Sequence, residues 1–237
     1  MANLESHRLP ELPESGYYIP NFISAEQEAY ILEEVSKLPE GRWKVLTHRR
    51  LLSLPSQLTG TARDTLIDAP LPRFLATPVL DQLKALEVFV GSPHGGPNHC
   101  LVNEYQPAQG IMPHEDGPAY HPITATVSLG SHTVLDVYRK NEQGEREAAP
   151  SWRILQEPRS LLVTTGDMYG GTLHGIAELG EDQDLGSETI VNWALLADKG
   201  AYKSGAAKRA TRLSLTYRDV LKVAKLGGAM KFMNKQR

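Results

Sequence analysis

The sequence predicts an α+β protein whose core is an antiparallel β-barrel or a double-sheet jelly roll. Two helix patterns lie in the first part of the chain. After Gly96 the pattern changes to short β-rich runs that turn residues separate. The length of 237 residues suits one domain with a sizeable core.

The two helices are predicted from their ends and their apolar stripes. Ser24 followed by Gln27 is a capping-box signature, and apolar residues then recur every three or four positions. We therefore expect a helix over about 24–38. A second helix is expected from Pro78 to about Val90, because proline suits the first turn and Gly91 follows as a stop.

The strands are predicted from apolar and β-branched runs. We expect them near 99–105, 123–129, 132–138, 152–155, 160–164, 190–197 and 211–217. The mixed segment 41–72 gives no clear pattern. The expected organisation is a flexible leader over 1–16, a single domain over 17–220 and a basic C-terminal tail over 221–237.

Composition excludes several classes of protein. No apolar run approaches the roughly 18 residues that a membrane span needs, so no membrane partner is expected. The first 30 residues are acidic and show no signal peptide. A single cysteine, Cys100, excludes a disulfide scaffold and fits a reducing compartment. We expect the protein in the cytoplasm and nucleus.

Charge is unevenly distributed along the chain. The segment from Lys199 to Arg237 holds eleven basic residues and one acidic residue, a net charge of +10, whereas the preceding part carries −13. A basic C-terminal segment is typical of contact with nucleic acid. An equally good account is that the charge only aids solubility.

A candidate metal site begins at His114-Glu115-Asp116. In an extended segment His114 and Asp116 point to the same face, which supplies two of the three ligands of a non-haem Fe(II) triad. His174, within Leu-His-Gly-Ile, is the candidate for the third. Taken singly, a His-x-Asp pair is commonly a polar surface pair, and a histidine between Leu and Gly is more often structural.

Anion-binding side chains are predicted on two strands. In 211–218, Arg212, Ser214, Thr216 and Arg218 alternate with apolar residues, so they share one face. Buried guanidinium groups need anions, and a planar Arg fork matches a carboxylate. Asn103 and Tyr105 also share a face and can donate to an anionic ligand. The alternative is an exposed edge strand.

Together these residues resemble the signature of the AlkB-type Fe(II)/2-oxoglutarate-dependent dioxygenases. The resemblance extends over about Tyr17 to Val220, and it is strongest to one group, the sixth eukaryotic AlkB homologues. The residues that carry it are Asn103, Tyr105, Gly110, His114, Asp116, His174, Arg212, Ser214 and Arg218, with the stretches 110–118, 128–136 and 157–163.

The resemblance implies a double-stranded β-helix (jelly roll) core with two N-terminal supporting helices. It implies that His114, Asp116 and His174 hold Fe(II) and that Arg212 binds the distal carboxylate of 2-oxoglutarate. Asn103, Tyr105 and Ser214 would complete the 2-oxoglutarate site, and Arg218 would lie near co-substrate and substrate. The implied reaction consumes O2 and 2-oxoglutarate and hydroxylates a C–H bond. An oxidised N-methyl group would then leave as formaldehyde.

The substrate is less sharply indicated. Many AlkB-type enzymes act on alkylated bases in DNA or RNA, and a duplex base must first be flipped out. Tyr120 is a candidate for stacking on a base, although a turn residue packed between prolines is the stronger interpretation. The segment 41–72 would form the substrate lid, and its candidate phosphate or base contacts are Arg42, Trp43, Lys44, His48, Arg49 and Arg50.

Two alternatives stay open. The same oxygenase chemistry could act on a protein or a small molecule. The chain could also be a nucleic-acid-binding module with little turnover. Against the second alternative, all three metal ligands and the arginine are present.

Overall fold

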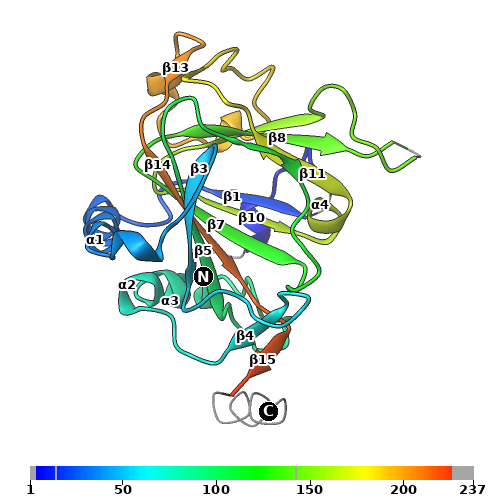
Figure 1. Cartoon of the computed structure of the whole chain (residues 1–237). Coiled ribbons are helices and arrows are strands. Elements are labelled where there is room, and N and C mark those ends of the chain that lie inside the picture. Colours follow the sequence, from blue (N-terminus) through cyan, green and yellow to red (C-terminus); the bar gives the residue numbers. More distant parts are fainter. Residues whose placement is uncertain (1–3, 14, 142, 226–237) are drawn as a thin grey trace.

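Two β-sheets packed face to face form the body of the protein (Figure 1). The computed structural model describes residues 4–13, 15–141 and 143–225. The larger sheet has the strand order β1-β10-β7-β14-β5-β3-β2, and the smaller has the order β6-β11-β8-β9. Neighbouring strands in both sheets are antiparallel. This sheet-rich arrangement confirms the predicted α+β jelly roll.

The strand bounds agree with most of the predicted segments. The larger sheet contains β1 (Gly16–Ile19), β2 (Lys44–Leu46), β3 (Arg49–Leu54), β5 (His99–Tyr105), β7 (Ile123–Leu129), β10 (Leu161–Thr165) and β14 (Arg212–Arg218). The smaller contains β6 (Ile111–His114), β8 (Thr133–Arg139), β9 (Trp152–Gln156) and β11 (Thr172–Ile176). Two additional pairs are β12 (Glu181–Asp182) with β13 (Ala207–Lys208), and β4 (Thr65–Ile67) with β15 (Lys222–Ala224).

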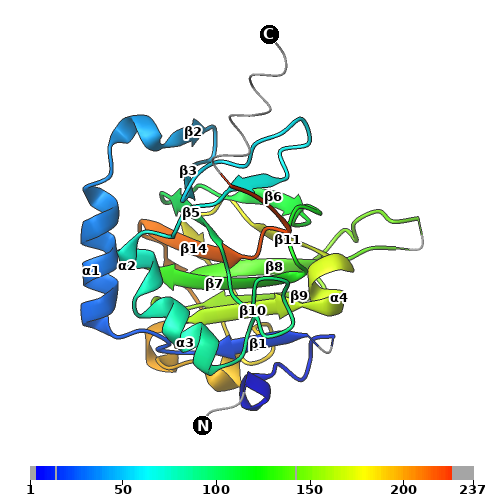
Figure 2. The ribbon, with the colours of Figure 1, turned by 90° about the horizontal axis from the view of Figure 1, so that it is seen from below.

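Helices cover the face of the larger sheet that lies away from the smaller sheet (Figure 2). They are α1 (Ala25–Ser36), α2 (Arg73–Ala76) and α3 (Val79–Ala85), while α4 (Gly166–Gly170) follows β10. Short 3-10 turns are η1 (Leu4–His7), η2 (Glu40–Arg42), η3 (Trp193–Leu195) and η4 (Lys199–Tyr202). None of the helices in the described ranges is long and apolar enough to cross a membrane.

The first helix begins as its sequence predicts. The Gln27 amide N–H donates to Ser24 Oγ at 3.2 Å, and the Ser24 N–H donates to Gln27 Oε1 at 2.9 Å. These two bonds satisfy donors that the first helical turn leaves free. Ile31 and Val35 are then buried against the sheet.

Strand β14 separates the apolar core from a polar cavity. Leu213, Leu215 and Tyr217 belong to the core beneath the helices, where the Tyr217 hydroxyl donates to the Leu75 carbonyl at 2.9 Å. Arg212, Ser214, Thr216 and Arg218 line the cavity on the opposite face. The period-two alternation of this strand therefore predicted both of its faces correctly.

Two predicted elements were wrong in extent or type. The second helix ends at Ala85 and not at Val90, because Glu87 takes a left-handed backbone conformation with φ 57°. The predicted strand 190–197 contains the 3-10 turn η3. There the Asn192 side chain pairs with the Leu155 backbone, accepting from its N–H at 2.9 Å and donating to its carbonyl at 2.7 Å.

The expected leader and tail also differ from the structure. Leu9 and Leu12 are buried, so this part of 1–16 packs onto the core and is no loose leader. At the other end, β15 pairs with β4, so the tail begins inside the fold. The rest of the expected tail, 226–237, lies outside the described residues. The domain limits 17–220 stay a prediction.

A candidate metal centre and its cavity

A cavity of about 720 Å³ lies between the two sheets. Strands from both sheets contribute to its wall, together with residues of the segment 41–72, which the sequence predicts to form a lid, and the start of β15. The candidate metal ligands, the candidate 2-oxoglutarate residues, Tyr120 and Arg218 all line this cavity. These residues are Asn103, Tyr105, His114, Asp116, Tyr120, His174, Arg212, Ser214 and Arg218.

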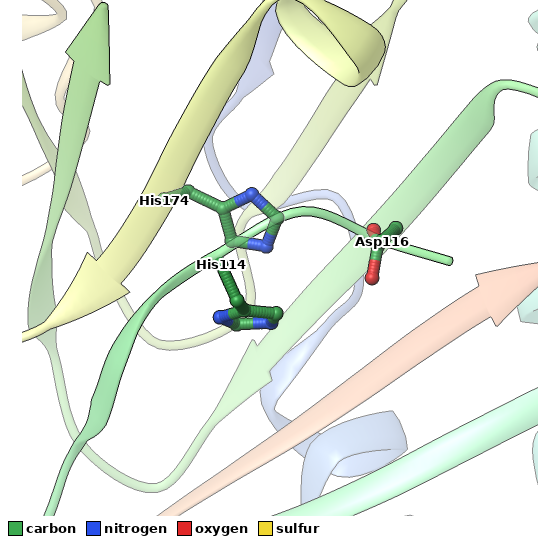
Figure 3. A group of neighbouring side chains, drawn as sticks. All are labelled: His114, Asp116 and His174. Carbon is green, nitrogen blue, oxygen red and sulfur yellow. The ribbon is translucent and has the colours of Figure 1, made fainter. Parts of the chain in front are cut away.

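His114, Asp116 and His174 converge at one point of the cavity (Figure 3). One ligand atom from each lies within 4.8 Å of the others. Antiparallel pairing of β6 and β11 places His114 directly opposite His174, with ring centroids 4.5 Å apart. Asp116 follows β6 by two residues. Strand pairing thus brings together ligands that lie far apart in the sequence.

The His114 ring is held in one orientation by its own backbone. Its Nδ1 lies 2.9 Å from the Met112 carbonyl oxygen. Because a carbonyl only accepts, Nδ1 carries the hydrogen and Nε2 presents its lone pair. Such a bond to the second ring nitrogen is common for metal-binding histidines.

Asp116 is held on both carboxylate oxygens. Thr124 Oγ1 donates to Oδ2 at 2.9 Å, and the Arg218 guanidinium forms an ion pair with Oδ1. Burial by itself would raise the pKa of Asp116, but the charge of Arg218 and the nearby His174 bring this pKa below its usual value. Asp116 is therefore kept as an anion.

His174 is kept neutral by its surroundings. Burial lowers its pKa to about 4, although the charge of Asp116 acts in the opposite direction. Only a neutral imidazole can bind a metal ion. The cluster thus places two imidazole rings, on the paired strands β6 and β11, beside one carboxylate.

The predicted co-substrate residues face one another across two neighbouring strands. In the pairing of β14 with β5, Arg212 lies opposite Tyr105 and Ser214 lies opposite Asn103. Arg212 is 4 % exposed, and its guanidinium carbon lies 5.8 Å from the centre of the Tyr105 ring. Antiparallel register therefore gathers all four side chains on one wall.

Arg212 has only neutral hydrogen-bond partners in the described part of the chain. Its Nη2 donates to Ser128 Oγ at 2.8 Å and to Gln156 Oε1 at 3.2 Å. Its Nε and Nη1 are buried without a hydrogen-bond partner. A buried cation without a charged partner is suited to bind an anionic ligand.

Sequence reasoning missed the side chains that support these groups. Thr124 and Ser128 lie on β7, where alternation places Thr124, Thr126 and Ser128 on one polar face. That alternation could have indicated from the sequence that β7 has a polar face. Gln156 ends β9, one residue beyond the predicted strand, and nothing local marks it.

On the lid side, Tyr120 and Arg218 lie together. The Arg218 guanidinium stacks over the Tyr120 ring at 4.8 Å, and Tyr120 forms a β-bridge with Val220. The lid contributes Arg49 and Arg63 to the cavity. Arg49 also reaches the co-substrate wall, because its Nε donates to Asn103 Oδ1 at 3.2 Å.

Other candidate lid contacts are already engaged within the protein. Arg50 forms ion pairs with Glu104 and Glu40 and stacks over Trp43, which is itself buried. His48 lies 3.2 Å from a Glu178 carboxylate oxygen. Of the six candidates, only Arg49 lines the cavity, while Arg42 and Lys44 are exposed outside it.

The residues present fit a non-haem iron and an anionic co-substrate. Two imidazoles and one carboxylate are the donor set of the facial triad, which leaves open positions on the metal. Residues 16–218 match the sequence profile of the 2OG-Fe(II) oxygenase superfamily. The chain belongs to this superfamily. As such an oxygenase, it uses Fe(II), 2-oxoglutarate and O2.

Several known proteins resemble this oxygenase. It is 39 % identical over 232 residues to a probable RNA/DNA demethylase, ALKBH6 of Danio rerio, covering 94 % of this chain and 93 % of that one. It is 29 % identical to the tRNA (carboxymethyluridine(34)-5-O)-methyltransferase alkbh8 of Xenopus tropicalis, covering 89 % of this chain but 32 % of that one. The oxygenase is therefore AlkB-type, as its motifs suggested.

A solved structure supports the fold. The structure of OsALKBH1 superposes with a TM-score of 0.55 at 16 % identity, covering 88 % of this oxygenase and 98 % of that chain.

Proposed function

We propose that this oxygenase oxidatively demethylates or hydroxylates a modified nucleic acid. The observation that carries the proposal is one cavity lined by both the His114, Asp116 and His174 cluster and the buried, carboxylate-free Arg212. The first set suits Fe(II), and the second suits a dicarboxylate.

In this proposal the three ligands hold iron, and neighbouring side chains fix them. The Met112 carbonyl orients His114, while Thr124 and Arg218 hold the Asp116 carboxylate. When bound, Fe(II) and 2-oxoglutarate supply the activation of O2 that oxidises a C–H bond, with succinate and CO2 as products. The protein's own part is to orient both reactants in the cavity.

Arg212 is proposed to bind the distal carboxylate of 2-oxoglutarate. Asn103, Tyr105 and Ser214 would donate to the remaining oxygens, since all three line the wall beside Arg212. Burial raises the pKa of Tyr105, so its hydroxyl keeps the proton that it would donate.

Nucleic acid is the proposed substrate class because of the relatives and the lid. One relative is named as a probable RNA/DNA demethylase and another modifies tRNA. Arg49 and Arg63 of the lid line the cavity and would contact phosphates. Tyr120, which the Arg218 guanidinium covers on one face, would lie beside an extruded base.

The co-substrate assignment is tested with Arg212→Ala. We expect 2-oxoglutarate affinity to fall by roughly a thousandfold, because a buried charge pair loses several kcal/mol when one partner is removed. Binding of Mn²⁺ should persist. Calorimetry of metal-loaded wild type and variant gives both quantities, and unchanged 2-oxoglutarate affinity would refute the assignment.

The substrate class is tested by binding and by turnover. RNA or DNA oligonucleotides should bind with an affinity that falls steeply with salt, as phosphate contacts require. Conversion of 2-oxoglutarate to succinate with iron and ascorbate should occur. Turnover without nucleic-acid binding would indicate a protein or small-molecule substrate, and binding without turnover would indicate a binding module.

A further inference from the structure

Arg212 differs from the other buried arginines of the described chain in its partners. The buried Arg209 donates to both oxygens of Asp182, at 2.7 and 2.6 Å. Arg218 forms an ion pair with Asp116. Arg212, at 4 % exposure, instead contacts the Ser128 hydroxyl and the Gln156 amide oxygen.

These neutral partners form a closed network. The Ser128 hydroxyl accepts from Arg212 Nη2 at 2.8 Å and donates to Gln156 Oε1 at 3.2 Å. Gln156 Oε1 also accepts from Arg212 Nη2 at 3.2 Å. Because both partners of Oε1 are donors, the amide orientation is fixed. Gln156 is 2 % exposed and Ser128 is fully buried, so the network is shielded from bulk solvent.

The network holds the guanidinium in place without neutralising it. An amide oxygen accepts a hydrogen bond but carries no formal charge, so the positive charge of Arg212 stays uncompensated inside the protein. Burial lowers the pKa of Arg212 to about 10, which reflects the cost of that isolated charge. A carboxylate that enters the cavity removes this cost.

We propose that Gln156 is a positioning residue that makes the cavity selective for a 2-oxo acid with a second carboxylate. The proposal rests on the function proposed above, namely that Arg212 binds the distal carboxylate. Gln156 acts through Arg212: it fixes Nη2 and keeps the guanidinium charge available. Selectivity then comes from the electrostatic mismatch between Arg212 and its neutral surroundings.

Gln156→Glu tests the inference with almost no change of shape. The new carboxylate would lie at hydrogen-bond distance from Arg212 Nη2 and would neutralise it internally, as Asp182 does for Arg209. An entering distal carboxylate would then meet a like charge. The matched control is Gln143→Glu, which adds the same charge on an exposed loop outside the cavity.

The measurement is the ratio of two dissociation constants on Mn²⁺-loaded protein. One ligand is 2-oxoglutarate, and the other is 2-oxopentanoate, which has the same five carbons but no distal carboxylate. We expect Gln156→Glu to weaken 2-oxoglutarate at least thirtyfold and 2-oxopentanoate by less than threefold. The thermal midpoint without ligand should stay equal or rise. Gln143→Glu should change neither constant.

An unchanged ratio in folded Gln156→Glu would overturn the inference. If that variant fails to fold, Gln156→Met replaces it. Loss of the acceptor should weaken binding of 2-oxoglutarate about fivefold and leave binding of 2-oxopentanoate unaffected. Equal effects on both dissociation constants would overturn the inference. Arg212→Met is measured in parallel. Wild-type 2-oxoglutarate affinity in Arg212→Met would refute the assignment of Arg212 in the proposed function. Loss of affinity in Arg212→Met, together with unaltered affinity in the Gln156 variants, would refute only the role of Gln156.

Discussion

Glu28 joins helix α1 to the sheet through two hydrogen bonds. Its carboxylate accepts from the Gly130 N–H at 2.8 Å and from Arg159 Nη1 at 2.9 Å. Gly130 has φ +80°, and a Cβ there would lie 2.6 Å from the Thr211 carbonyl oxygen. A single acidic side chain and a single glycine therefore fix the turn that follows β7.

His99 of β5 is a buried histidine that should make stability depend on pH. It is 1 % exposed, and burial together with the Arg218 charge lowers its pKa from 6.5 to about 4. Between pH 6.5 and 4 the unfolded chain therefore binds the proton and the folded chain does not. Stability from this group is complete above about pH 6.5 and is lost as the pH falls toward 4.

The free energy of unfolding is expected to fall by about 3 kcal/mol at most, since one pKa unit corresponds to about 1.36 kcal/mol. Replacement by glutamine (His99→Gln) removes the titrating group, so the free energy of unfolding should vary less over this range. Urea unfolding of metal-free protein between pH 4.5 and 7.5 measures it. Equal slopes for variant and wild type would contradict this role of His99, while a residual slope from His174 is expected in both.

Strand β11 can approach β6 closely only because Gly175 follows His174. A Cβ at this position would lie 2.9 Å from the Pro113 nitrogen and 3.0 Å from the Ile111 carbonyl oxygen, both backbone atoms that cannot move aside cheaply. The pairing is irregular here, with a register shift between His174 and Ile176. The spacing of the two strands thus sets the spacing of the two histidines.

We expect Gly175→Ala to weaken metal binding at least tenfold. The added methyl would push the strands apart and shift His174 away from His114, at a stability cost of about 1–3 kcal/mol. Calorimetric titration with Mn²⁺ measures the effect. Gly180→Ala is the control, since a Cβ there meets nothing within 4 Å. Metal affinity that is the same in both variants would be evidence against the close-approach argument.

Strand β15 supports the segment 41–72, the proposed substrate lid, from the C-terminal side. It pairs in parallel with β4, Lys222 forms an ion pair with Asp64, and the Asp68 N–H donates to the Ala224 carbonyl at 2.9 Å. Figure 1 shows β4 and β15 side by side at the bottom of the molecule. The lid is therefore tied to the strand that follows Arg218.

Truncation after Leu221 should loosen the lid, because it removes every one of these contacts. We expect limited proteolysis to cleave within 56–64 faster than in the full chain. Truncation after Lys225 is the control: it keeps β15 and removes only 226–237, so lid protection should persist. Both truncations should lower nucleic-acid affinity and its salt dependence through lost charge. Equal protection of the lid in both would contradict its support by β15.

At the scale of the whole molecule, the cavity joins the two sheets. The wall that carries Arg212 belongs to the larger sheet, whereas His114 and His174 lie on β6 and β11 of the smaller sheet. Metal and co-substrate that bind only this assembled cavity must stabilise the folded state by mass action. At 100 times the dissociation constant the gain is about 2.7 kcal/mol.

The midpoint temperature of thermal unfolding should therefore rise in two steps. For a domain of this size, the gain corresponds to about 5–10 °C for each saturating ligand. Mn²⁺ in place of EDTA should give the first increment, and 2-oxoglutarate added to Mn²⁺-loaded protein the second. Arg212→Ala should keep the first and lose the second. A second increment that survives in this variant would place the co-substrate elsewhere.

Local patterns in the sequence determined several elements of secondary structure and part of the candidate site. The capping box at Ser24 predicted where α1 begins, and the alternation in 212–218 predicted both faces of β14. His114 and Asp116 were visible as a pair on one face of an extended segment, because residue type and spacing decide which side chains share a face, whereas His174 was assigned only by its place in the family motif. Such signals depend only on neighbours in the chain.

Tertiary structure alone decided the rest. The register that sets His174 opposite His114, the neutral network around Arg212 and the parallel pairing of β15 with β4 all join residues that lie far apart in the sequence. The apolar run 190–197 became a turn because Asn192 satisfies the Leu155 backbone as a strand would. Local periodicity fixes a side chain's face, whereas its partner across the cavity and its dielectric surroundings exist only after the two sheets have packed.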